Sequence, residues 1–77
     1  MAVNRRSLVQ SIAESRAALD AQGADLEKQG RLITAMEQAG EDVSDIKEMH
    51  DLLIRMHGIA RRRLDATSAG MEKLPPA

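Results

Sequence analysis

The sequence predicts an all-α protein: a long antiparallel two-helix hairpin, or coiled coil, that dimerises into a four-helix bundle. Apolar residues recur every seven positions in the first half of the chain, a matching pattern occupies the second half, and a glycine-containing break separates the two. A seven-residue apolar repeat is typical of a helix that packs along another helix. The first half carries this repeat at Ile12, Leu19, Leu26 and Ile33.

Composition narrows the fold and the classes of function. The 77 residues include no cysteine, phenylalanine, tryptophan or tyrosine, and the formal net charge is −1. Domains this short often need disulfides, metals or oligomerisation, and only oligomerisation remains here for a chain without cysteine. The near-neutral charge gives no general attraction to nucleic acid, and no apolar run approaches the ~20 residues of a membrane span. We therefore expect a cytoplasmic protein with no membrane segment and no bound cofactor.

The first helix is expected over residues 5–39, after a disordered stretch at 1–4. Asn4 or Ser7 is suited to cap its N-terminus. Gly23 and Gly30 interrupt it, seven residues apart, and each costs a helix roughly 1 kcal/mol relative to alanine. They are either local weak points or places where a neighbour approaches closely.

The break between the helices is expected at residues 40–42, with a second helix over 43–69. Gly40 suits the left-handed residue that ends a helix. Asp42 suits the N-cap of the second helix, with Ser44 as the alternative. Residues 70–77 are expected to form a flexible tail, because Gly70 can end the helix and no helix continues through the two prolines that follow.

Pairing the two patterns in antiparallel fashion predicts the contacts between the helices. Met36 then faces Ile46, and Ile33 faces His50, with most layers holding at least one aliphatic side chain. The expected apolar seam of the hairpin consists of Leu8, Ile12, Leu19, Leu26, Ile33, Met36, Ile46, Leu53, Ala60 and Leu64.

The second helix carries more apolar surface than one partner helix covers. Met49, Leu52, Met56 and Ile59 extend its apolar stripe beyond the seam. A stripe this wide is typical of an interface. A second copy of the chain is the first expectation, with a homodimer as the simplest assembly. A groove for a larger protein partner is the second.

The two histidines, His50 and His57, are seven residues apart, or ~10.5 Å along a helix. That spacing is too long for one metal ion between them, so no metal site is expected within one chain. We interpret them as residues that set the register against Gln29 and Gln22. A pH switch is the alternative, because protonation near pH 6 would place charge in a partly apolar seam.

The arginine run Arg61, Arg62 and Arg63 is the one candidate for phosphate contact. Successive helical residues point about 100° apart, so the run forms no flat patch, and the chain has no aromatic side chain to stack on bases. Nucleic acid is therefore not the favoured partner. No nucleophile, base and orienting carboxylate fall in an arrangement typical of catalysis, so no catalytic residue and no enzymatic activity are expected.

Segment 29–42 contains Arg31-Leu32-Ile33, Glu37, Gly40 and Asp42, and an amphipathic helix follows it to the arginine run. Over roughly residues 26–64 the chain resembles short uncharacterised bacterial helical-hairpin proteins. The resemblance implies a helical hairpin and assigns no functional residues. The function expected from the sequence is a non-catalytic protein–protein interaction module: a small adaptor, assembly factor or inhibitor. The alternative is a nucleic-acid-associated accessory protein using the arginine run.

Overall fold

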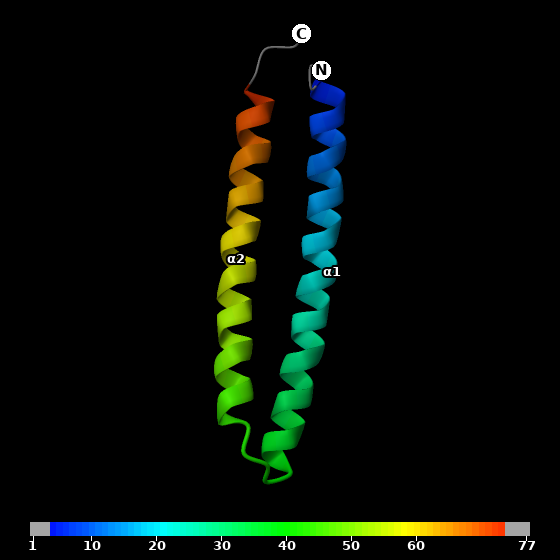
Figure 1. The fold of residues 1–77 in the computed structure, drawn as a ribbon. Helices are drawn as coiled ribbons and strands as arrows, with labels where there is room; N and C mark the ends of the chain where they lie inside the picture. The colour runs from blue at the N-terminus through cyan, green and yellow to red at the C-terminus, as the bar shows by residue number, and fades with distance from the viewer. Residues whose placement is uncertain (1–3, 74–77) are drawn as a thin grey trace.

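The computed structural model describes residues 4–73, which form two α-helices joined by a short turn. Helix α1 spans Arg5–Gln38 and helix α2 spans Ser44–Glu72. The helices run antiparallel, so the start of α1 lies beside the end of α2 at the open end of the hairpin (Figure 1). The molecule is a rod of 60 × 20 × 15 Å. The predicted all-α hairpin is confirmed.

Helix α1 begins at a side-chain cap. The Oδ1 atom of Asn4 accepts a hydrogen bond of 2.8 Å from the backbone N–H of Ser7, which satisfies one of the amides that a helix N-terminus leaves free. Asn4 is thus the N-cap residue, as one of the two predicted candidates, and does not belong to the disordered stretch expected at residues 1–4. The rest of that stretch, residues 1–3, lies outside the described residues. The helix continues through Gly23 and Gly30 without a break.

The turn closes α1 with a glycine in the left-handed region, as predicted. Gly40 has a φ of 89°, and its N–H donates to the carbonyl of Glu37. The N–H of Glu41 donates to the carbonyl of Met36 at 3.1 Å. These two bonds form a Schellman motif, which satisfies carbonyls that the helix end would otherwise leave free.

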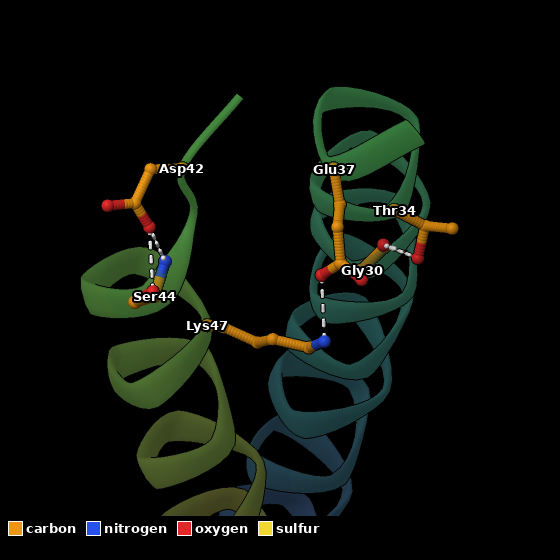
Figure 2. A network of polar contacts seen from close by, with 6 residues as sticks. All are labelled: Gly30, Thr34, Glu37, Asp42, Ser44 and Lys47. Carbon is orange, nitrogen blue, oxygen red and sulfur yellow. Dashed lines mark hydrogen bonds and ion pairs between the residues drawn. The ribbon is translucent and has the colours of Figure 1, made fainter. Parts of the chain in front are cut away.

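Helix α2 begins one residue later than expected. Val43, not Asp42, is the N-cap residue, and its side chain is buried with 4% of its surface exposed. Asp42 precedes the cap and accepts hydrogen bonds from the backbone N–H and the hydroxyl of Ser44, at 3.1 and 2.7 Å (Figure 2). These bonds hold the pKa of the Asp42 carboxyl below its ordinary value.

Helix α2 ends three residues later than expected. It passes through Gly70 and continues to Glu72, where the N–H of Lys73 donates to the carbonyl of Gly70 at 3.3 Å. A helical glycine costs only about 1 kcal/mol, which neighbouring helix formers can offset. The expected tail at 70–77 is therefore wrong for residues 70–72, Lys73 is the C-cap residue, and residues 74–77 lie outside the described residues.

The hairpin is held by one central row of side chains on each helix. Leu26, Ile33 and Val43 are buried, and they are the only buried residues among those described. The half-buried residues of these rows and their edges are Ile12, Leu19, Met36, His50, His57, Ala60, Leu64 and Met71.

Three residues of the predicted seam are exposed: Leu8, Ile46 and Leu53. Two packed helices bury only the row that lies directly between them. Ile46 and Leu53 lie one row to the side, along the edge of the contact. In the part of the chain that the structure describes, neither helix has a stretch long and apolar enough to cross a membrane.

Candidate functional site

The seam separates two long sides of the hairpin that differ in chemistry. The sides follow from the helical repeat, because residues seven apart lie on the same row of a helix. We call one the ion-pair side; it carries Arg16, Gly23, Gly30 and Glu37 of α1 and Lys47, Ile54 and Arg61 of α2. We call the other the groove side; it carries Ser15, Gln22, Gln29 and Met36 of α1 and Ile46, Leu53, Ala60 and Thr67 of α2.

Ion pairs cross between the helices on the first of these sides. Arg16 contacts Asp65 at 2.9 Å near the open end, and both side chains remain substantially exposed. Near the turn, Lys47 reaches across to Glu37 at 2.8 Å (Figure 2). The hydrogen bond and the negative charge of Glu37 raise the pKa of the Lys47 ammonium. Between these pairs, Arg61 lies 3.6 Å from Asp20.

Both histidines make the same contact, one heptad apart. The Nε2 atom of His50 lies 2.8 Å from the backbone carbonyl oxygen of Leu26, and that of His57 lies 2.7 Å from the carbonyl oxygen of Leu19. A carbonyl oxygen only accepts hydrogen bonds, so Nε2 carries the proton and donates in each case. Each ring thus bonds the backbone of the opposite helix in the middle of that helix.

Glycines make room for these rings. A Cβ atom added at Gly30 would lie 3.3 Å from Cε1 of His50, and one added at Gly23 would lie 3.2 Å from Cε1 of His57. Each glycine is four residues after the residue whose carbonyl its histidine contacts. In an ordinary helix, a side chain at that position leans over the carbonyl, and a glycine leaves the carbonyl accessible. Of the two interpretations of Gly23 and Gly30 that the sequence left open, the structure shows close approach.

The partners expected for the histidines were wrong by one position on α1. The rings lie over Gly30 and Gly23, one residue after the glutamines, and contact the backbone of α1. The signal that would have found the contact is in the sequence, because two glycines and two histidines share the spacing of seven. A pH switch stays a prediction; a proton added at Nδ1 leaves the Nε2–H bond to the carbonyl in place.

An open apolar groove runs along the groove side next to the turn. It holds about 380 Å³. Its floor comes from the seam and its walls from exposed aliphatic side chains of both helices. The lining residues are Gln29, Leu32, Ile33, Asp45, Ile46, Met49, His50 and Leu53. Farther toward the open end, smaller side chains line a second hollow, among them Ser15, Ala18, Ala60 and Thr67.

The four residues predicted as an interface continue from this groove around α2. Met49, Leu52, Met56 and Ile59 are 66%, 49%, 56% and 44% exposed. We call these four residues the α2 strip. Leu52 and Ile59 lie on the side of α2 that points away from α1, so α1 is not able to cover them. The strip and the groove together hold seven of the exposed large apolar side chains, namely Leu32, Ile46, Met49, Leu52, Leu53, Met56 and Ile59, and they are the candidate site.

The arginine run does not form a single surface. Arg61 is engaged with Asp20, while Arg62 and Arg63 point to different sides of α2. Within residues 4–73, no group of three or more histidine, aspartate or glutamate side chains is arranged to hold a metal ion. The role of the run in phosphate binding stays a prediction.

Comparisons with known proteins find no relative of this chain. No family model matches the sequence, and no curated protein or solved structure matches it.

Proposed function

We propose that this protein is a non-catalytic protein–protein interaction module that acts as a self-associating helical hairpin. The exposed α2 strip is the observation that carries the proposal. Solvent-exposed aliphatic side chains in a continuous row are typical of a surface that another protein covers. Adaptors, assembly factors and small inhibitors are the kinds of protein that act through such a surface.

The small internal core also supports self-association. Only Leu26, Ile33 and Val43 are buried among the described residues, which is little apolar burial for two helices of this length. Packing a second hairpin against α2 would bury the strip of both copies. The product is a bundle of four helices in which each α2 gains a second neighbour.

The test is the mass of the protein in solution, measured by light scattering. The refractive index should report concentration, because the chain contains no tryptophan or tyrosine. We expect the mass of a dimer for the unaltered chain. Met56→Glu should convert it to a monomer while helical circular dichroism remains, because the substitution places a charge within the covered strip.

Ile54→Glu is the matched control. Ile54 is 47% exposed, similar to the strip residues, but lies on the ion-pair side of α2. It should leave the dimer intact. A wild-type monomer at all concentrations would overturn self-association, and equal effects of the two substitutions would remove the α2 strip as its site.

A further inference from the structure

The α2 strip has a property that one-sided amphipathic helices do not generally share: its pattern is the same in both directions. Asp45 lies four residues before Met49, and Arg63 lies four residues after Ile59. The successive spacings from Asp45 to Arg63 are four, three, four, three and four. The six residues that follow this spacing are Asp45, Met49, Leu52, Met56, Ile59 and Arg63.

All six residues lie on one face of α2. At 100° per residue they fall within an arc of about 80°. Asp45 borders the apolar groove near the turn, and Arg63 borders the second hollow near the open end. Both are exposed, and among residues 4–73 neither forms an ion pair, although three other cross-helix pairs exist. The apolar strip is therefore flanked by one free acid and one free base.

We infer that the partner is a second copy of this chain, with the two α2 helices packed antiparallel through the α2 strip and Asp45 of each copy paired with Arg63 of the other. This inference rests on the proposed self-association and adds its geometry. A two-fold axis near Ile54 superposes the pattern on itself. Met49 then meets Ile59 of the second copy, and Leu52 meets Met56, in a self-complementary contact.

Electrostatic repulsion disfavours a parallel arrangement of the two α2 helices. Parallel α2 helices would place Asp45 against Asp45 and Arg63 against Arg63, and like charges at an interface are unfavourable. The antiparallel arrangement places an opposite charge at each end. The hairpin as a whole has the same preference, because acidic residues gather at the turn and arginines at the open end. The acidic group contains Glu37, Glu41, Asp42, Asp45 and Glu48, and the basic group contains Arg5, Arg6, Arg61, Arg62 and Arg63.

Charge reversal tests the geometry. At low salt, Asp45→Arg and Arg63→Asp should each raise the dissociation constant of the dimer about tenfold, because repulsion replaces attraction at both ends. The double variant with both substitutions should return to within about twofold of the original value, since the attraction is restored with its sign exchanged. The measurement is mass against protein concentration for each variant.

Neighbouring residues that point away from the strip provide controls with the same change in net charge. Asp51→Arg matches Asp45→Arg, and Arg62→Asp matches Arg63→Asp; both control residues are exposed. They should leave the dissociation constant unchanged. A dimer whose affinity responds equally to test and control substitutions, or in which the double variant is weaker than either single variant, overturns the antiparallel contact and leaves self-association standing. A monomeric wild type overturns both.

Disulfide trapping tests the register without relying on charge, in a chain that has no cysteine of its own. The double variant Met49→Cys with Ile59→Cys should form a covalent dimer on oxidation. Met49→Cys alone should not, because the two positions 49 would be about 15 Å apart along the helices. Efficient trapping by Met49→Cys alone would show parallel helices and overturn the inference.

Discussion

The two sides of the hairpin are built on the same seam but have opposite properties. On the ion-pair side, glycines let His50 and His57 reach the α1 backbone, and salt bridges join the helices above and below them. On the groove side, larger uncharged residues such as Leu53 line an open groove and form no ion pair among the described residues. The ion pairs that join the helices therefore lie on one side and the surface left for a partner lies on the other, with His50 lining both. A partner can cover the groove without competing with the ion pairs.

The largest effect is expected where the two sides meet. Leu26→Asp places a charge at a buried position of the shared seam, so we expect a loss of about 3 kcal/mol or more, enough to unfold the hairpin. Thermal unfolding followed by circular dichroism measures it. Leu32→Asp is the control, since Leu32 is an exposed leucine of the same helix on the groove side. Retained stability of the Leu26 variant would mean that the seam is placed wrongly.

Substitutions at two neighbouring residues of α1 compare the ion-pair side with the groove side. Gly30→Val should destabilise the hairpin by roughly 1 to 2 kcal/mol, because the added side chain displaces the His50 ring from the Leu26 carbonyl. Gln29→Val, one residue away on the groove side, should cost much less. Urea unfolding at a fixed chain concentration measures both.

A double-mutant cycle identifies the source of that loss. Once His50→Ala has removed the ring, Gly30→Val should cost little, because the same contact is not lost twice. Fully additive effects of the two substitutions would show that the glycine does not act through the histidine.

The ion pairs should contribute modestly. Asp65→Asn removes the charge that Arg16 contacts at 2.9 Å, and we expect a loss of about 0.5 kcal/mol at low salt that shrinks as salt is added. Asp25→Asn is the control, since Asp25 is exposed and forms no ion pair among the described residues. A salt-independent difference between the two variants would count against an electrostatic origin.

The smallest effect is expected on the pH dependence of stability, through Asp42. The pKa of Asp42 is lower in the folded protein, so its stabilising contribution is full above the ordinary value of 3.8 and is lost as the pH falls through the lowered value. Asp42→Asn should therefore lower the free energy of unfolding near pH 7, and the difference from the original chain should disappear as the pH falls through that window. Comparing the unfolding free energies of the two chains from pH 7 to pH 2 tests the sign.

Much of this architecture could be predicted because it is encoded in short-range patterns. The seven-residue repeat placed Leu26 and Ile33 in the seam, and Gly40 marked the turn at the only residue with a positive φ among those described. The helix ends were less accurate. Asp42 and Gly70 are residue types that commonly begin and end a helix. At the start of α2, however, the N-cap residue is Val43, and at its end the helix continues past Gly70.

The candidate site was predicted in part. The sequence singled out Met49, Leu52, Met56 and Ile59 as surplus apolar residues, and the structure exposes all four. A groove for a partner was the second expectation, but the sequence did not place it next to the turn, because a groove depends on how far apart two helices lie at their edges. That distance is set by the side chains of both helices together.

Two amphipathic helices that fold back at Gly40 follow from the residue pattern alone, since heptad spacing and a left-handed glycine are local properties of the chain. Which row of α2 is covered depends instead on how the two helices pack. Val43, His50 and His57 lie toward α1, while Ile46 and Leu53 lie at its edge. The physical reason is the pair of glycines on α1, which admit the histidine rings to the backbone and so fix the rotation of α2 about its own axis. That rotation leaves the α2 strip facing outward.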